Sequence, residues 1–298
     1  MSTSVDRRAD PGAAWFSAMR RGDFAAAWRI SDATLAERRA AGPCWHLPRH
    51  QQWVWDGRPL TGQRVLVRCY HGLGDTIQFA RFLPLLAERC RELTVWAQAP
   101  LIPLLERMAQ PFKLLPLHDG TPELDYDVDI EIMEITHALR STPESLSTGV
   151  PYFAVAPESS RQSSLRVGLV ARAGDWDARR SVPNALMMTL TDIPGIRTFN
   201  LQLGSAVPRA ADISTPDILA LAARMRGLDL VITVDTMTAH LAGALAVPTW
   251  TVLPSEADWR WMADRDDSPW YPTMCLFRQS AAGDWAPVIR RVRQALGG

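Results

Sequence analysis

Short apolar segments alternate with amphipathic, helix-like segments from Gln63 onward, and this alternation restricts the fold more than any other feature of the 298-residue chain. In the first series, the pattern predicts helices at 75–90 and 100–109. The candidate strands lie at 64–70, 93–97, 112–117 and 126–132. Strands that alternate with helices form a parallel sheet with right-handed crossovers. We therefore expect one α/β unit in this part of the chain.

A second series of the same kind begins after a polar, loop-like segment at 157–164. It predicts strands at 166–171, 196–202, 229–234 and 248–253. The candidate helices lie at 183–191, 216–226, 236–246 and 285–296. Two successive series predict an α/β fold with two Rossmann-like parallel-sheet domains that face each other across a cleft.

The segment before both series has a different pattern. Apolar residues recur at helical spacing over 12–40, with a turn at Arg21-Gly-Asp23, which predicts two helices. The pair resembles one helix–turn–helix unit of a tetratricopeptide array, and a single unit cannot bury both of its faces. We expect residues 1–60 to form a short helical extension and connector. Residues 61–160 then form the N-terminal domain and residues 161–298 the C-terminal domain, whose last helix is expected to pack back on the N-terminal domain.

Composition argues against several classes of partner. The chain carries 32 basic and 32 acidic residues, so its formal charge is zero and provides no general attraction to nucleic acid or to a membrane surface. Its four cysteines are scattered without a CxxC pair, which is typical of free thiols in a reducing compartment. The N-terminus has no secretion signal, and polar residues interrupt the longest apolar region, at 228–254. We expect a cytoplasmic protein without a transmembrane segment.

The segment His71-Gly-Leu-Gly-Asp75 follows the first candidate strand and opens the first helix of that series. Ligands of α/β proteins bind at this end of parallel strands. Gly72 and Gly74 allow backbone conformations closed to other residues and a close approach of substrate to the main chain. Asp75, at the helix start, is a candidate proton acceptor. The alternative is structural, because aspartate often caps a helix N-terminus.

The carboxyl end of the strand at 229–234 is a second candidate site. Asp235 and Thr236 lie there, where a helix is expected to begin. Unpaired N–H groups and the positive end of the helix dipole favour a phosphate at such a position. Thr236 and Thr238 add hydroxyl donors, and His240 lies about one turn into the helix, where it could contact a phosphate or sugar oxygen. The alternative is a capped helix with a hydrogen-bonded histidine.

The loop after the first strand of the second series is a third candidate. Gly174 permits a tight turn, and Arg172, Arg179 and Arg180 could converge on a diphosphate, because guanidinium groups match phosphate oxygens. Solvent-exposed arginines are the alternative. The chain contains no GxGxxG, HExxH or GxSxG motif, so dinucleotide cofactors, zinc proteolysis and serine hydrolysis lack support.

Acidic residues alternate with apolar ones over 125–131, which raises the question of metal binding. An EF-hand loop needs glycine at its sixth position, where this chain has Ile130. A DxD metal site is a second alternative. Strict alternation places the four carboxylates, Asp125, Asp127, Asp129 and Glu131, on one face of a strand. That arrangement favours an edge strand over a metal site.

Several separated segments resemble one known family. They are Trp55-Asp-Gly-Arg-Pro-Leu-Thr-Gly62, Gly72-Leu-Gly-Asp-Thr-Ile-Gln-Phe-Ala-Arg-Phe-Leu-Pro84, Val234-Asp-Thr-Met-Thr-Ala-His-Leu-Ala-Gly243, Asp258-Trp-Arg-Trp261, Asp267-Ser-Pro-Trp-Tyr-Pro272 and Leu276-Phe-Arg-Gln279. In this order and spacing they resemble the glycosyltransferase domain attached to many bacterial tetratricopeptide-repeat proteins, which is related to the ADP-heptose lipopolysaccharide heptosyltransferases of glycosyltransferase family 9. The similarity covers residues 50–296. It implies a GT-B fold whose C-terminal domain holds the donor nucleotide, with no metal or other cofactor.

The resemblance also implies roles for individual residues. Asp75 matches the aspartate proposed as general base toward the acceptor hydroxyl. The other candidate residues on the acceptor side of the cleft are His71, Gly72, Gly74 and Gln78. The candidate donor-binding residues are Arg172, Arg180, Gln202, Asp235, Thr236, Met237, Thr238 and His240.

These matches predict an inverting, metal-independent glycosyltransferase. It would move a sugar, a heptose among the candidates, from a nucleotide-diphosphate sugar to a hydroxyl of a saccharide, a lipid-linked acceptor or a protein. Two segments depart from the family pattern: Tyr70 and His71 replace a Glu-Gln pair, and the loop at 171–176 replaces a Trp-(Ala/Ser)-Gly-Asn-Pro loop. Because both lie in the expected cleft, a catalytically silent module that binds a nucleotide sugar, or a protein partner through its N-terminal helices, is the alternative. A nucleotide-sugar epimerase is a third hypothesis.

Overall fold

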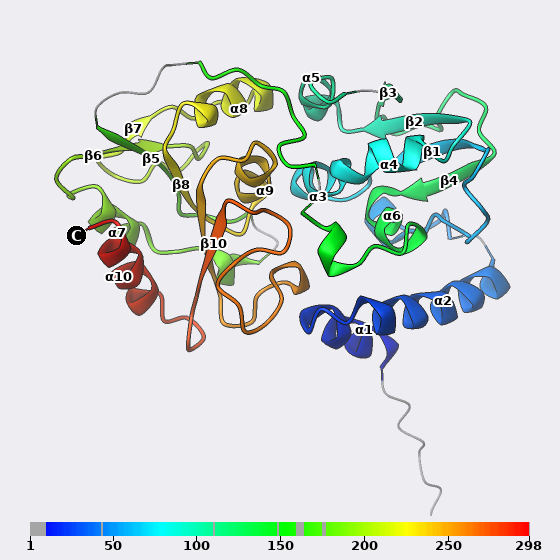
Figure 1. Ribbon diagram of the computed structural model, residues 1–298, viewed down its shortest axis with the longest axis horizontal. Coiled ribbons are helices and arrows are strands. Elements are labelled where there is room, and N and C mark those ends of the chain that lie inside the picture. Colours follow the sequence, from blue (N-terminus) through cyan, green and yellow to red (C-terminus); the bar gives the residue numbers. More distant parts are fainter. Residues whose placement is uncertain are drawn as a thin grey trace, which may run out of the picture.

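The computed structural model describes residues 10–42, 44–109, 111–147, 149–158, 164–174 and 177–297. Figure 1 shows two α/β units side by side, the C-terminal unit on the left and the N-terminal unit on the right, with a pair of helices below the right-hand unit. Each unit is built on one parallel sheet, as the alternation of strands and helices predicts.

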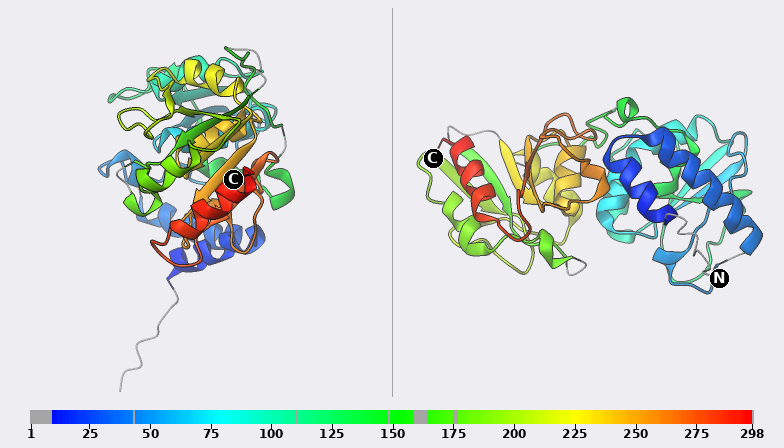
Figure 2. Two further views of the ribbon diagram at one scale, coloured as in Figure 1. Left: turned by 90° about the vertical axis from the view of Figure 1, so that its left-hand side faces the viewer. Right: turned by 90° about the horizontal axis from the view of Figure 1, so that it is seen from below.

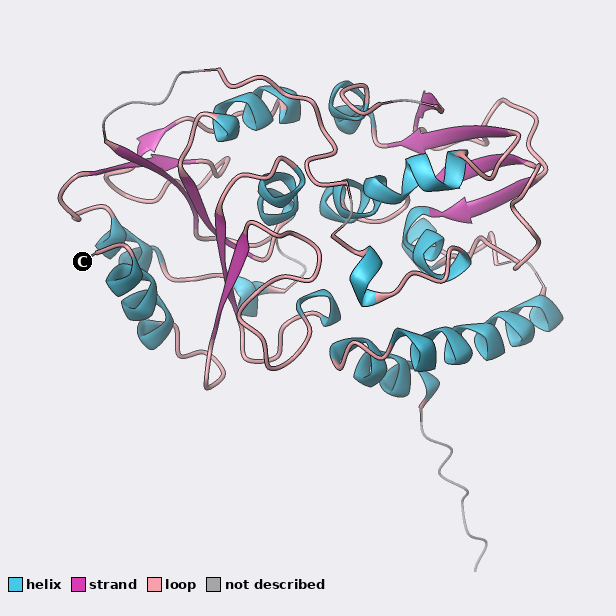
Figure 3. Ribbon diagram, viewed as in Figure 1, coloured by secondary structure: helices cyan, strands magenta, loops and turns pink. Residues whose placement is uncertain are grey.

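The N-terminal sheet has the strand order β3-β2-β1-β4, and its neighbouring strands are parallel (Figure 3). Its strands are β1 (Arg64–Arg68), β2 (Glu92–Ala97), β3 (Lys113–Pro116) and β4 (Val128–Glu131). Its helices are α3 (Leu73–Phe79), α4 (Leu83–Ala87), α5 (Ile102–Leu105) and α6 (Ile135–Ala138). The four strands predicted for this unit are confirmed, with small shifts at their ends.

The helix predicted over 75–90 is divided in two. A 3-10 turn at Ala80–Phe82 separates α3 from α4. Pro84 explains the division, because proline has no backbone N–H to donate to the carbonyl four residues earlier. Pro100 and Pro103 similarly shorten the helix predicted over 100–109 to a 3-10 turn followed by α5.

The C-terminal sheet has the strand order β10-β9-β8-β5-β6-β7, again parallel throughout. Its strands are β5 (Leu165–Val170), β6 (Ile196–Asn200), β7 (Ala211–Asp212), β8 (Leu230–Val234), β9 (Thr249–Leu253) and β10 (Met274–Arg278). Its helices are α7 (Asn184–Met187), α8 (Ile218–Arg226), α9 (Met237–Ala244) and α10 (Ala286–Ala295). The prediction omits β7 and β10, the two edge strands: β7 has only two residues, and in β10 the exposed Cys275 lies between the buried Met274 and Leu276.

The last helix, α10, packs within its own unit. It contacts β10 and α7, and Figures 1 and 2 place it on the outer side of the C-terminal unit. The expectation that it packs back on the N-terminal domain is therefore wrong. The short connection from β10 allows the apolar stripe of Val288, Ile289 and Val292 to fold directly onto the neighbouring sheet, where these residues are buried.

The two N-terminal helices, α1 (Pro11–Arg20) and α2 (Phe24–Ala41), form the predicted pair and pack on both units. The indole Nε1 of Trp28 in α2 donates to the carbonyl of Ser141 in the N-terminal unit at 2.8 Å. In α1, Trp15 packs edge-on against Trp259 of the C-terminal unit at 5.3 Å between ring centroids. The backbone N–H of Ala263 also donates to the carbonyl of Arg20 at 2.9 Å. The extension therefore connects the two units.

Among the described residues, no helix combines the length and the apolar character that crossing a membrane requires.

Candidate functional site

The N-terminal ends of α3 and α9 meet between the two units. α3 follows β1 and α9 follows β8, and the two helices contact each other. A Cβ atom added at Gly74 would lie 3.0 Å from Cδ2 of His240 and 3.2 Å from Cα of Met237. The missing side chain of Gly74 thus permits this close approach, while neither Gly72 nor Gly74 adopts a positive φ. The expectation of special glycine backbone conformations in this segment is therefore wrong.

Asp75 is a helix cap and an ion-pair partner at the same time. One carboxylate oxygen, Oδ2, accepts a hydrogen bond from the backbone N–H of Gly72 at 2.9 Å. The other, Oδ1, accepts from Nη2 of Arg260 at 2.5 Å. The structural alternative for Asp75 is confirmed by the first contact. The second contact joins the N-terminal unit to the C-terminal unit directly.

Arg260 is the residue of this site that sequence reasoning missed. Its side chain is 11 % exposed and also binds Oδ1 of Asp258 through Nη1 at 2.9 Å. Its guanidinium lies over the rings of Trp259 and Phe79, at 4.8 and 5.6 Å from the centroids. Burial opposes the charge of Arg260, but the carboxylates of Asp258 and Asp75 outweigh burial and raise its pKa. The guanidinium is therefore a fixed positive charge.

His71 pairs with a buried carboxylate. Its ring nitrogen Nδ1 lies 2.9 Å from Oε1 of Glu131, whose side chain is 3 % exposed. Burial lowers the pKa of His71, but the hydrogen bond and the charge of Glu131 outweigh it, and the net shift is upward. The charge of Asp75 acts in the same direction, and that of Arg260 opposes it.

The four acidic residues of 125–131 all form ion pairs, and Asp125 remains 91% exposed. β4 is the edge strand that the alternation predicts. Asp127 and Asp129 bind the guanidinium groups of Arg64 and Arg68, both at 2.8 Å. In the part of the chain that the structure describes, no group of three or more histidine, cysteine, aspartate or glutamate side chains is placed to hold a metal ion.

On the α9 side, Asp235 and Thr236 shape the helix N-terminus. Thr236 is the cap, and its Oγ1 accepts from the N–H of Thr238 at 3.2 Å. Nη1 of Arg180 donates to the carbonyl of Asp235 at 3.0 Å and lies 3.8 Å from its carboxylate. Burial and the charge of Asp258 raise the pKa of Asp235, and the charges of Arg180 and Arg260 oppose this shift. A guanidinium is thus held beside the start of α9.

His240 is a buried, hydrogen-bonded histidine, as the structural alternative predicts. Its Nδ1 lies 3.0 Å from the hydroxyl of Tyr271, and its ring stacks on Trp261 at 5.4 Å between centroids. Burial lowers the pKa of His240 well below its usual value, and the charges of nearby arginines, Arg260 first, add to the effect. The ring is therefore neutral. Its contact with a phosphate or a sugar stays a prediction.

The remaining arginine and glutamine candidates lie in the segments after β5 and β6 and do not gather at one point. Gln202 accepts from the backbone N–H groups of Ala171 and Arg172 at 3.2 and 2.9 Å, so it holds the loop after β5. Arg179 binds Asp177 and is largely exposed, so it does not converge with Arg180. Arg172 is also exposed, and Asp175 and Trp176 of the same loop lie outside the described residues.

Gln78 does not line an open cleft. It is fully buried in α3, and its two amide atoms have no hydrogen-bond partner among the described residues. The prediction that Gln78 lines the acceptor side of the cleft is therefore wrong. Gln78 lies more than one turn after the start of α3, so it is not at the N-terminal end of the helix, where α3 meets α9.

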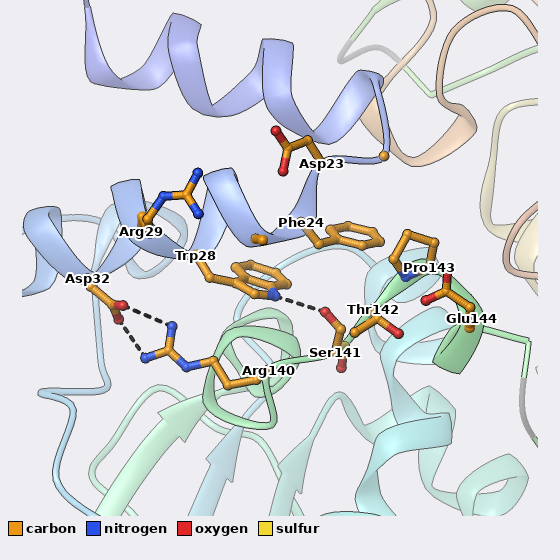
Figure 4. A pocket seen from close by; sticks show the side chains of 12 residues that line it. Asp23, Phe24, Trp28, Arg29, Asp32, Arg140, Ser141, Thr142, Pro143 and Glu144 are labelled. Atoms are coloured by element: carbon orange, nitrogen blue, oxygen red, sulfur yellow. Dashed lines mark hydrogen bonds and ion pairs between the residues drawn. The ribbon is translucent and has the colours of Figure 1, made fainter.

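A pocket of about 540 Å³ lies away from the meeting point of α3 and α9. Figure 4 shows it between the turn that joins α1 to α2 and the segment from Arg140 to Glu144. The stacked rings of Phe24 and Trp28 and the ion pair of Asp32 with Arg140 line it. It contains none of the predicted site residues.

The ionisation of Glu134, in the N-terminal unit, makes the folding stability depend on pH in a way that can be measured. Its Oε2 accepts from the N–H groups of Trp55 and Glu131, both at 3.0 Å. Burial raises the pKa of Glu134 from 4.5 to about 7, although those two hydrogen bonds favour the charged form. The folded state therefore holds this proton more tightly than the unfolded state, and the associated stability is lost as the pH rises from about 4.5 to about 7.

Replacing Glu134 by glutamine should remove this loss. The free energies of unfolding of Glu134→Gln and of the wild type are measured by urea titration at pH 5 and at pH 8. We expect the difference between the two proteins to change by about 2 kcal/mol in favour of the variant from the lower to the higher pH. Glu106→Gln, at an exposed glutamate, serves as the control. A difference between Glu134→Gln and wild type that does not change with pH would contradict the assignment.

No family model matches the chain. The protein FlbA of Caulobacter vibrioides is 24% identical to this chain over an alignment of 317 residues. The alignment covers 90% of this chain and 52% of FlbA. This chain thus spans about half the length of that curated relative.

Solved structures of glycosyltransferases have a similar fold. A family 9 glycosyl transferase from Veillonella parvula has a TM-score of 0.55 at 12% identity, with 79% of this chain and 90% of that chain covered. The ADP-heptose lipopolysaccharide heptosyltransferase II of E. coli has a TM-score of 0.58 at 13% identity, over 78% and 97%. The E. coli heptosyltransferase WaaC with ADP has a TM-score of 0.51 at 13% identity, over 78% and 98%.

These likenesses define the fold class. The chain has two parallel-sheet α/β domains in the GT-B-like arrangement of the heptosyltransferases.

Proposed function

We propose that the chain is a glycosyltransferase that moves a sugar from a nucleotide-diphosphate sugar to a hydroxyl acceptor, with inversion and without a metal. One observation carries the proposal: the N-terminus of α9, with Arg180 beside it, meets the N-terminus of α3, which carries Asp75 and His71. An anion-binding group and proton-accepting groups are thus brought together from two domains. The fold shared with heptosyltransferases supports the same reading.

The α9 side suits the donor. The positive end of a helix and a guanidinium both stabilise negative charge, and the leaving nucleoside diphosphate gains such charge as the glycosidic bond breaks. Thr236, at the cap, and Arg180 are the proposed diphosphate ligands. Asp235 acts by holding Arg180 through its carbonyl and carboxylate. Gln202 and Arg172 shape the neighbouring loop.

The α3 side suits the acceptor. Inversion in one step requires the acceptor hydroxyl to attack the anomeric carbon while a base removes its proton, a contribution of about 10²–10⁴-fold in rate. Asp75 is the candidate base that the family resemblance implies. It can serve in this way when an incoming substrate separates it from Arg260. The identity of the sugar, a heptose included, belongs to the same proposal.

A catalytically silent module is the second candidate function. The engagement of both Asp75 oxygens favours it, because a carboxylate bound to Gly72 and Arg260 is not free to accept a proton. In that case the chain would bind a nucleotide sugar, or a partner at α1 and α2, where Phe16 is 49% exposed. A cytoplasmic location is part of either proposal.

Binding and turnover with a donor panel separate the two functions. We expect calorimetric titration with ADP-, UDP- and GDP-sugars to reveal one preferred base, and mass spectrometry to detect transfer to saccharide acceptors that persists in excess EDTA. Nuclear magnetic resonance of the product should show the inverted anomer. Binding without any transfer would favour the silent module, and the absence of binding to every donor would refute the transferase.

A further inference from the structure

Asp75 and His71 differ in how many of their polar atoms already form hydrogen bonds. Both oxygens of Asp75 already accept hydrogen bonds, from Gly72 and from Arg260. His71 uses only Nδ1, toward Glu131, and its Nε2 has no hydrogen-bond partner among the described residues. Its side chain is 31% exposed, compared with 24% for Asp75. The site therefore contains a second basic group, and this one has a free nitrogen.

We propose that His71, oriented by Glu131, is a proton acceptor of the site and takes the proton of the acceptor hydroxyl at Nε2. This inference rests on the proposed function and concerns the same proton for which Asp75 is the other candidate. Asp75 then remains paired with Arg260 and acts on the reaction through its charge.

Glu131 is suited to orient the imidazole. Its Oε2 accepts from the backbone N–H of Met133 at 2.7 Å, and its Oε1 accepts from that of Tyr70 at 3.3 Å. A carboxylate fixed in this way accepts the Nδ1–H of His71, which leaves the lone pair of the neutral ring on Nε2. A free lone pair at that atom is what a general base requires.

The backbone of His71 is held as well. The side-chain amide of Gln98 donates to the carbonyl of His71 at 2.8 Å, and Gln98 in turn accepts from the hydroxyl of Thr76 in α3 at 3.0 Å. Contacts from β4, from the segment after β2 and from α3 therefore fix one imidazole next to the N-terminus of α3. This precision is typical of groups that must meet a reacting atom.

Three charged groups face the imidazole. Glu131 on β4 and Asp75 on α3 favour its protonated form, whereas Arg260, from the loop after β9, opposes it. The two carboxylates together stabilise the imidazolium that forms when His71 takes a proton. The net effect is a pKa above the usual value for histidine, which makes His71 a stronger base.

The proposed step balances with no further reactant. The acceptor oxygen bonds to the anomeric carbon as the bond from that carbon to the diphosphate oxygen breaks. The bonding electrons leave with the diphosphate, and the acceptor proton moves to Nε2 of His71. The imidazolium then releases this proton to solvent, and the neutral ring is restored.

The pH dependence of transfer tests this inference. We expect His71→Gln to lower kcat by about 10²–10⁴-fold and to abolish the loss of activity on the acid side of the pH profile. Glu131→Gln should shift that acid limb to lower pH, because a neutral amide stabilises the imidazolium less. Asp75→Asn should be slower than the wild type but keep the acid limb. His50→Gln, at an exposed histidine, is the matched control.

Two results would overturn the inference. One is a His71→Gln enzyme whose kcat stays within about threefold of the wild type. The other is a wild-type acid limb that persists in His71→Gln and disappears in Asp75→Asn. Either result would leave the proposed transferase intact, whereas a wild-type protein that transfers no sugar would refute the proposed function itself.

A measurement that does not depend on turnover tests the role of His71 separately from any loss of activity caused by misfolding. We expect the ¹³C resonance of the His71 ring in labelled protein to titrate at higher pH in the wild type than in Glu131→Gln. Circular dichroism establishes that the variants are folded. Identical titration of His71 in the two proteins would show that Glu131 does not act on the ring and would contradict the proposal.

Discussion

Arg260→Met should lower the free energy of unfolding by about 3 kcal/mol, because it leaves two carboxylates without their shared cation in a partly buried site. Asp75 and Asp258 both bind this guanidinium, and their side chains are 24% and 36% exposed. Methionine keeps an unbranched apolar side chain beside Trp259 and Phe79 but supplies neither a charge nor a hydrogen bond. Urea titration at neutral pH measures the loss.

Arg265→Met is a matched control from the same part of the chain. Arg265 pairs with Asp267, whose side chain is 71% exposed. An exposed pair of this kind contributes about 0–1 kcal/mol. Equal losses for the two variants would show that the contacts of Arg260 carry no special weight.

Arg180→Ala should weaken donor binding and slow transfer more than it affects folding. Loss of a charge-assisted hydrogen bond costs about 1.5–3 kcal/mol, so we expect the Kd for the preferred nucleoside diphosphate to rise about tenfold or more. We expect kcat to fall by about 10²–10³-fold, since the same guanidinium would stabilise charge on the leaving group. Calorimetry and initial rates measure the two effects.

The neighbouring arginine provides the control for this second variant. Arg179 lies beside Arg180 in the same 3-10 turn, but its side chain is 74% exposed and binds Asp177. Arg179→Ala should therefore bind the donor as the wild type does. If the two variants lose affinity equally, general surface charge rather than a specific diphosphate contact attracts the nucleotide.

Most of the fold follows from local sequence patterns. The central strands of both sheets contain continuous apolar runs, Val65–Val67 in β1 and Leu230–Ile232 in β8, which is the pattern of strands buried on both faces. Helix ends marked by Asp23 or Thr236 were recognisable from capping residues. The edge strands are harder to predict, because β7 has only two residues and β10 is buried at alternate positions only in its first half.

The site was predictable only in part, because its decisive contacts join distant residues. Arg260 and Asp75 are 185 positions apart, and nothing near either residue indicates the partner. The sequence pattern places Glu131 with three other acidic residues on one face of an edge strand, and it does not show that the Glu131 side chain is only 3% exposed and binds His71. Gln78 belongs to the sequence segment that predicts the acceptor side, and only tertiary packing shows that its side chain is enclosed.

The attachment of α1 to the loop that contains Trp259 and Ala263 has a consequence for how the molecule can be divided. Arg260 belongs to that loop, so α1 helps to set the position of a guanidinium that lies beside the proposed reaction centre. A fragment that starts after the helical pair would retain both sheets but lose this anchor. We therefore expect the smallest fragment that keeps the proposed site intact to include α1 and α2.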